Sequence, residues 1–152
     1  ANMDHGTGGP FGAAIFDAEG RLVAPGMNLV TARNCSVLHA EIVAIMIAQR
    51  AVCAYDLGEE GRNMALVSSV EPCAMCLGAI HWSGVLRLVC GGRDEDARAI
   101  GFDEGPKPPE GIRVLERDGL TVARDVLRKE AAAILQRYAA QGGPIYNPAR
   151  PT

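Results

Sequence analysis

His39-Ala40-Glu41 and Pro72-Cys73-Ala74-Met75-Cys76 are the two stretches of this chain around which its fold and its chemistry are organised. A His-x-Glu triplet is common in proteins, and a single Cys-x-x-Cys also occurs in structural zinc sites and in redox pairs. The chain has no second cysteine pair with which this one could complete a four-cysteine zinc site. The two motifs are therefore informative together and in this order, rather than singly.

Each motif stands at the start of a predicted helix. Residues 39–55 are apolar on nearly all sides, which is typical of a helix buried in the interior. Residues 65–70 form a short apolar run that predicts an interior strand. A second helix is predicted over 73–83, with Pro72 placed just before its first turn, where proline is tolerated. The predicted strand thus lies between two helix starts, one with the histidine and one with the cysteines.

Three of the motif side chains form a ligand set for zinc. A catalytic zinc site takes three protein ligands and leaves one position open, and His39, Cys73 and Cys76 offer one imidazole and two thiolates. The Cys-x-x-Cys spacing places both sulfurs on one side of a first helical turn. Such a site has a charge near zero, so a general base must help. Glu41 is the candidate that takes a proton from the attacking water and returns it to a leaving group.

The other segments alternate between predicted strands and helices. The predicted strands are 12–17, 21–27, 85–91 and 112–116, the predicted helices are 94–100 and 121–140, the loops are 28–38 and 101–111, and a tail spans 142–152. This alternation predicts an α/β fold with one mixed five-stranded sheet, helices on both faces and the last two strands parallel. We expect residues 1–152 to form a single domain, with an N-terminal helix missing from this sequence or lying upstream of it.

The composition argues against a nucleic-acid-binding protein and against a membrane-spanning one. Of the 152 residues, 15 are basic and 18 are acidic, for a net charge of −3, whereas nucleic-acid binders usually carry a basic face. No apolar stretch is long enough to span a bilayer, and no secretory signal is visible. Three of the five cysteines show no paired spacing, which favours reduced thiols in the cytoplasm.

In their order, the two motifs match the His-x-Glu and Pro-Cys-x-x-Cys signature of zinc deaminases that act on nucleobases. The chain resembles the cytidine-deaminase superfamily and, within it, the bacterial guanine deaminases and related nucleobase deaminases. The resemblance covers roughly two thirds of the chain and rests on Gly8–Ala13, Gly26–Thr31, His39–Glu41, Glu71–Trp82 and Gly101–Asp103. It implies a three-layer fold of the cytidine-deaminase type, a Zn²⁺ cofactor and hydrolytic release of ammonia from a free base.

The resemblance also implies roles for single residues. Phe11 would stack on the base, Asn28 would hydrogen-bond the base edge with its amide, and the backbone N–H of Ala40 would meet a base carbonyl or ring atom. Trp82 would form a wall of the pocket, and Asp103 would meet the amino edge of guanine. Ordinary structural roles compete with these: packing for the two aromatic rings, a turn for Asn28 and a cap for Asp103.

The C-terminal third of the chain lies outside the resemblance. The identity of the substrate is therefore left open. Guanine deaminases close the pocket with C-terminal residues, sometimes from a swapped partner subunit; here Tyr146 is the candidate, and a homodimer is implied. Cytosine and s-triazines are alternative substrates. A tRNA adenosine deaminase and a free-nucleoside deaminase are alternative enzymes, although the predicted helix 121–140 is only mildly basic. An intact Glu41 disfavours a non-catalytic zinc module.

Overall fold

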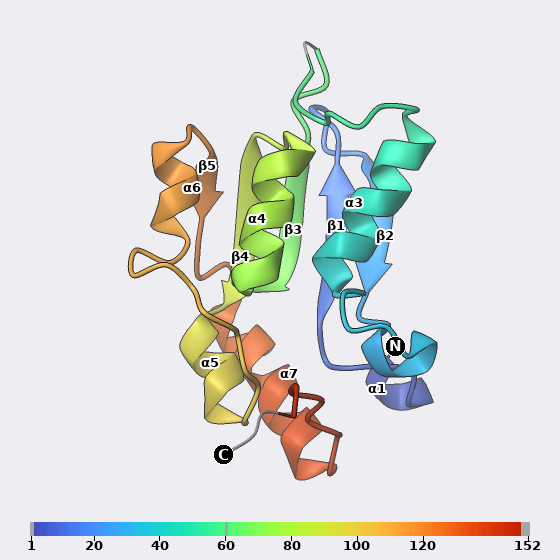
Figure 1. Cartoon of the computed structure of the whole chain (residues 1–152), viewed down its shortest axis with the longest axis vertical. Coiled ribbons are helices and arrows are strands. Elements are labelled where there is room, and N and C mark those ends of the chain that lie inside the picture. Colours follow the sequence, from blue (N-terminus) through green and yellow to red (C-terminus); the bar gives the residue numbers. More distant parts are fainter. Residues whose placement is uncertain (1, 60, 150–152) are drawn as a thin grey trace.

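Helices and strands alternate along the computed structural model, which describes residues 2–59 and 61–149 (Figure 1). The strands are β1 (Gly12–Phe16), β2 (Leu22–Met27), β3 (Ala65–Val70), β4 (Arg87–Gly92) and β5 (Thr121–Ala123). The helices are α1 (Asn2–His5), α2 (Val30–Arg33), α3 (Ala40–Ala51), α4 (Ala74–Ser83), α5 (Asp94–Ala99), α6 (Arg113–Arg117) and α7 (Arg128–Ala140). Residues 150–152 of the predicted tail, and the helix expected upstream, lie outside the described residues.

The five strands form one mixed sheet in the order β2-β1-β3-β4-β5, which confirms the predicted α/β fold. β1 runs antiparallel to both of its neighbours, β2 and β3. β3 and β4 are parallel, and so are β4 and β5, as predicted for the last two strands. All strands except β1 therefore point the same way. Because of this, the segments that follow β2, β3 and β4 all start from one edge of the sheet.

Helices cover both faces of the sheet. Leu66 and Leu88 are fully buried in the main core, on the face where α3 and α4 stand side by side (Figure 1). Their neighbours Val67 and Val89 point to the opposite face, because side chains alternate along a strand, and line a groove there together with α7. Within the described residues, no helix has both the length and the apolar character needed to span a membrane.

The fifth strand lies later in the chain than the sequence predicts. Residues 112–116 are predicted as a strand, but Arg113–Arg117 form the helix α6. The alternation of Ile112 and Val114 is misleading there, because the two well-buried residues are Ile112 and Leu115, three apart as on one face of a helix. The strand is instead β5, where Thr121 N–H donates to the Leu86 carbonyl (3.0 Å) and continues the pairing with β4.

The last helix is consequently shorter than predicted. It begins at Arg128 rather than at residue 121, because Asp125 and Leu127 adopt left-handed backbone conformations (φ of 61° and 54°) that a helix cannot include. The predicted loop 28–38 also contains one short helix, α2, which ends at Asn34 in the same left-handed region (φ 48°). Both differences lie where local backbone geometry overrides the hydrophobic pattern.

A glycine lets α3 lie directly on β2 and so fixes the start of that helix. A Cβ built on Gly26 would lie 2.6 Å from the backbone nitrogen of Ala44, and closer still to the Ala40 carbonyl oxygen. Both atoms belong to the helix backbone, which cannot swing away as a side chain can. Gly26 therefore determines the distance between β2 and the helix that carries Glu41.

Substitution of Gly26 by alanine is expected to lower the free energy of unfolding by about 3 kcal/mol, because overpacking forces the backbone to shift. Chemical denaturation measures this change. The matched control is Gly12→Ala on the adjacent strand, where the nearest atom to an added Cβ is 3.9 Å away. Equal stability of the two variants would contradict the close approach at Gly26.

Candidate active site

Two helix N-termini meet at one point. His39 precedes α3 and Cys73 precedes α4, each as the N-cap residue in an extended conformation. An N-cap side chain often accepts a hydrogen bond from the first helical turn, yet neither side chain does so here. The backbone carbonyls of both residues accept the first intrahelical bonds, from Val43 (3.0 Å) and Leu77 (2.9 Å). Both side chains are thereby left to point at each other.

The three predicted ligands form a compact group. The Nδ1 atom of His39 lies 3.4 Å from the Sγ atom of Cys73 and 3.8 Å from that of Cys76. The three ligand atoms lie within 4.8 Å of one another, and within the described residues they form the cluster that could hold a metal ion. One imidazole and two thiolates in this arrangement fit Zn²⁺, and three ligands leave a fourth position open for chemistry.

The surroundings favour the charged form of one thiol. The hydrogen bond from the Cys76 thiol, followed by the contact with His39, lowers the pKa of Cys73 to about 4 despite burial. The pKa of Cys76 moves the other way, because its proton is the one shared with the Cys73 sulfur. The start of α4 adds a partial positive charge beside both sulfurs. A thiolate is the form that binds metal.

Glu41 lies beside the ligands without belonging to them. It is in the first turn of α3 and is buried, and its Oε1 accepts a hydrogen bond from the Ser68 hydroxyl on β3 (3.2 Å). Burial, followed by the charge of Cys73, raises the pKa of the Glu41 carboxyl above its usual value. A carboxyl with a raised pKa accepts a proton more readily than an exposed one. This is the property that the predicted general base requires.

A cavity of about 330 Å³ opens above this group. His39, Glu41 and Cys73 line it, and so do four residues predicted to contact substrate: Phe11, Asn28, Asp103 and Tyr146. Ala40 is buried between two cavity-lining neighbours, as the first residue of α3. The N–H groups of a first helical turn have no partner within the helix, so the position of Ala40 suits the predicted N–H contact.

Trp82 does not line the cavity within this chain, which corrects the prediction. Its side chain is 82% exposed and packs edge-on against His81, with 5.5 Å between ring centroids. The reason is its place on the helix: Cys73 precedes α4, while Trp82 stands near the far end. Nine residues of helix span about 13 Å, so the ring lies well away from the metal ligands.

Three aromatic rings form one wall of the cavity. Phe102 makes edge contacts with Phe11 (4.9 Å between centroids) and with Tyr146 (5.1 Å). Phe102 has no role predicted from the sequence, although it lies within the Gly-Phe-Asp segment of the family resemblance. The rings come from three distant parts of the chain, so this wall exists only in the tertiary structure.

Asn28 is held in a fixed orientation. Its Oδ1 accepts hydrogen bonds from the backbone N–H groups of Gly9 (3.4 Å) and Val30 (3.2 Å). Among the described residues, no acceptor pairs with its Nδ2. An amide fixed through its oxygen presents its two N–H donors in a defined direction, and Asn28 lines the cavity.

Glu104, rather than Asp103, is the buried acid at the cavity. Asp103 is exposed, and its Oδ1 accepts a hydrogen bond from Gly105 (2.8 Å). Glu104 is buried, and burial raises its pKa to about 7, partly offset by Lys107. Glu104 is not among the residues predicted from the sequence. The alternation of buried Phe102, exposed Asp103 and buried Glu104 is that of an extended segment with one inward side.

The C-terminal tail packs on its own chain over the cavity. The side chain of Asn147 donates to the Gly101 carbonyl (2.8 Å) and accepts from Asp103 N–H (2.9 Å). The hydroxyl of Tyr146 is buried, and within the described residues it has no hydrogen-bond partner. A Cβ on Gly9 would collide with that hydroxyl, so the loop that contains Phe11 leaves room for the tail.

Comparison with known proteins agrees with this geometry. The family model for the cytidine and deoxycytidylate deaminase zinc-binding region matches residues 1–92, which contain the three candidate ligands and Glu41. The guanine deaminase of Bacillus subtilis is 41% identical over 102 residues, which cover 67% of this chain and 62% of that protein. This chain therefore spans less than two thirds of that curated relative.

Solved structures extend the similarity to nearly the whole chain. The structure of guanine deaminase from Nitrosomonas europaea superposes with a TM-score of 0.87 at 46% identity, covering 91% of this chain and 77% of that one. A structure in complex with 2,6-diaminopurine superposes with a TM-score of 0.89 at 47% identity, covering 95% of this chain and 77% of that one. The fold is thus shared with these proteins.

Removal of Zn²⁺ by a chelator is expected to lower the melting temperature by roughly 10 °C, because bound metal stabilises only the folded state. Cys73→Ser should lower zinc content and melting temperature together. Metal analysis and differential scanning fluorimetry measure both quantities. Cys53→Ser, at an exposed cysteine, is the control and should change neither. A Cys73→Ser variant with full zinc and normal melting would contradict the ligand set.

Proposed function

The chain belongs to the family of cytidine and deoxycytidylate deaminase zinc-binding domains, and from that membership we propose that it hydrolyses the amino group of a free purine base, guanine. The observation that carries the proposal is the 46–47% identity, over more than nine tenths of the chain, to structures of a guanine deaminase and of a complex with 2,6-diaminopurine. The cavity above His39, Glu41 and Cys73 is the place for that base.

The reaction adds water to the carbon that bears the amine. A C–O bond forms, the C–N bond breaks, and the products are ammonia and the oxo base. His39, Cys73 and Cys76 would hold Zn²⁺, which would supply Lewis-acid activation of water at neutral pH. Glu41 takes a proton from the attacking water, delivers it to a ring nitrogen and then carries a proton to the leaving amine. Ser68 holds Glu41 in place through its hydrogen bond.

The cavity walls suit a flat base with both donors and acceptors. Phe11, Phe102 and Tyr146 provide aromatic surface for the ring plane. The Nδ2 of Asn28 donates to an acceptor on the base. The carboxylate of Glu104 accepts from the N–H and amino edge of guanine, the role that the sequence had suggested for Asp103. Cytosine and s-triazines lack the second ring that this aromatic wall accommodates.

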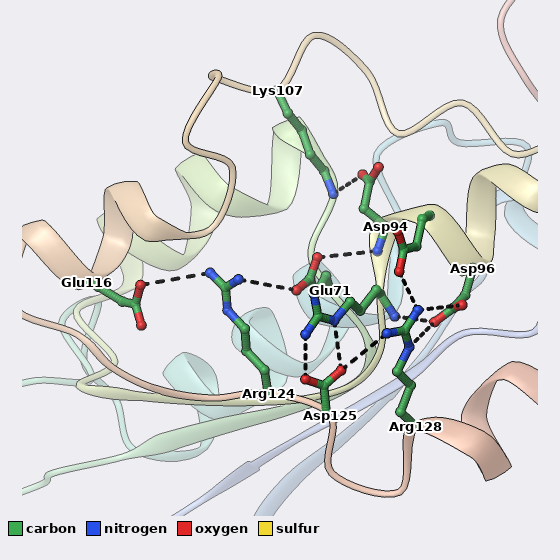
Figure 2. Close-up of polar contacts among 10 residues, drawn as sticks. Glu71, Asp94, Asp96, Lys107, Glu116, Arg124, Asp125 and Arg128 are labelled. Carbon is green, nitrogen blue, oxygen red and sulfur yellow. Dashed lines mark hydrogen bonds and ion pairs between the residues drawn. The ribbon is translucent and has the colours of Figure 1, made fainter.

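Two observations support a free base over an RNA substrate. The tail residues Tyr146 and Asn147 line the cavity from their own chain and restrict its opening, so we propose closure by the same chain rather than by a swapped partner segment. Two arginines at and just before the start of α7 are paired internally: Arg128 contacts Asp96 (2.9 Å), and Arg124 lies between Glu71 and Glu116 (Figure 2). Such pairs reduce the positive surface available to phosphates.

The test is ammonia release from the purified zinc enzyme across guanine, cytosine, isocytosine, adenine, an aminotriazine, the matching nucleosides and tRNA. We expect guanine to be turned over fastest. Faster turnover of a single-ring base, a nucleoside or tRNA would contradict the guanine assignment. Glu41→Gln should keep its zinc and lose about a thousandfold in turnover, and full activity of that variant would contradict the proton-transfer role.

The surface also supports a cytoplasmic homodimer. Apolar side chains are exposed on the two neighbouring helices α3 and α4, at Met46 (55%) and Trp82 (82%). Large exposed apolar groups on adjacent elements are typical of protein interfaces, and a second copy of the chain is the partner we propose.

The cysteines support the cytoplasmic part of this proposal. None of the five, all within the described residues, forms a disulfide, which suits a reducing compartment.

Sedimentation velocity at micromolar concentration tests the dimer. The wild-type chain should sediment as a dimer, and Trp82→Glu should shift it to monomer, because a carboxylate in an apolar interface must be desolvated without a partner. Tyr55→Glu is the matched control: its side chain is 85% exposed but lies outside both helices. A monomeric wild type, or a dimer that Trp82→Glu leaves intact, would contradict this surface.

A further inference from the structure

The acid proposed to recognise the base sits on a loop without regular structure. Glu104 lies between α5 and α6, in a segment with no helix or strand of its own. Its backbone is fixed at one point, where its carbonyl accepts a hydrogen bond from the Ala74 N–H at the start of α4 (2.9 Å). This bond sets the position of the main chain but leaves the side-chain torsions free. Something else must hold the carboxylate toward the cavity.

Lys107 supplies that contact. Its ammonium lies 3.5 Å from the Oε2 of Glu104, and the Lys107 side chain is only 12% exposed. Among the residues that the structure describes, Lys107 is the basic residue whose nitrogen comes within ion-pair distance of the Glu104 carboxylate. A lysine this well covered is uncommon at a protein surface. Its ammonium contacts both Glu104 on the same loop and Asp94 on α5, so it can hold the two segments together.

The ammonium is itself anchored from the far side. Asp94, at the first position of α5, forms an ion pair with Lys107 and accepts a hydrogen bond from Arg98 (2.6 Å). The backbone N–H of Asp94 donates a hydrogen bond to the Oε2 of Glu71 (3.3 Å). Glu71 follows β3 and lines the cavity. Figure 2 shows Lys107 paired with Asp94, whose backbone N–H contacts Glu71, and Glu71 in turn pairs with Arg124. Lys107 is therefore held by a short side chain, that of Asp94, whose backbone is fixed at the start of α5.

We propose that Lys107 is a positioning residue for base recognition, which orients the Glu104 carboxylate toward the substrate through an ion pair anchored on Asp94. The inference rests on the proposed deamination of a free base and names a determinant of its affinity. Lys107 does not line the cavity, so it acts through Glu104 and does not contact the substrate. An ion pair that is partly shielded from water holds a side chain more firmly than an exposed one.

The variant Lys107→Met removes the charge and keeps an unbranched side chain of similar length. We expect the KM for guanine to rise about tenfold or more, with a smaller change in kcat and unchanged zinc content. Lys107→Arg should restore most of the affinity, because a guanidinium also pairs with both carboxylates. Lys129→Met is the matched control: it removes the chain's other lysine, which is exposed on α7, and should leave KM unchanged.

A double-variant cycle separates positioning from a general loss of structure. If Lys107 acts through Glu104, then adding Lys107→Met to Glu104→Gln should have little further effect on KM. Additive losses in the double variant, or a wild-type KM for Lys107→Met, would overturn the proposal. Failure of the proposed function looks different: the wild-type enzyme would then not release ammonia from guanine. The cycle would in that case be run on whichever base the wild type turns over, with the same two outcomes.

Discussion

The site depends on one constraint: two helices must begin at the same edge of the sheet. β2 and β3 run in the same direction on either side of β1, so the segments after them emerge at one edge. α3 and α4 then start within contact distance, and His39 and Cys73 face each other as N-cap residues. The partial positive charges of the two helix ends favour the thiolate there. A shift of either helix along the sheet would separate the ligand atoms.

The same edge collects the groups that give the site its selectivity. The loop after α5 brings Phe102 and Glu104 to the cavity, and the tail brings Tyr146 across it. These segments have little regular structure, so single contacts hold them: Asn147 ties the tail to the loop, and Lys107 ties the loop to α5. The helices and strands thus carry the candidate metal ligands and Glu41, while segments without regular structure carry the residues proposed to recognise the base. This division allows related enzymes to change substrate without rebuilding the metal site.

Prediction from the sequence was most accurate next to the motifs. The strand predicted over 65–70 has the bounds of β3, and the helices that carry Glu41 and Cys76 begin within one residue of their predicted starts. Strong hydrophobic patterns and a proline mark these elements. The prediction failed over 112–127, where a three-residue strand and a five-residue helix are too short to show a clear period. Pairing with β4, not local propensity, makes residues 121–123 a strand.

The sequence by itself determined the fold class and predicted the ligand set and the general base, because residue types and spacing on two helix starts carry that information. The tertiary structure alone decided which acid is buried at the cavity, since Asp103 and Glu104 are adjacent and equivalent in chemistry. The structure also places Trp82 on the outer surface rather than in the cavity. It packs Tyr146 against Phe102, on a loop more than forty residues earlier in the chain. Spacing fixes neighbours along one helix, but contacts between distant loops depend on how the whole sheet places their ends.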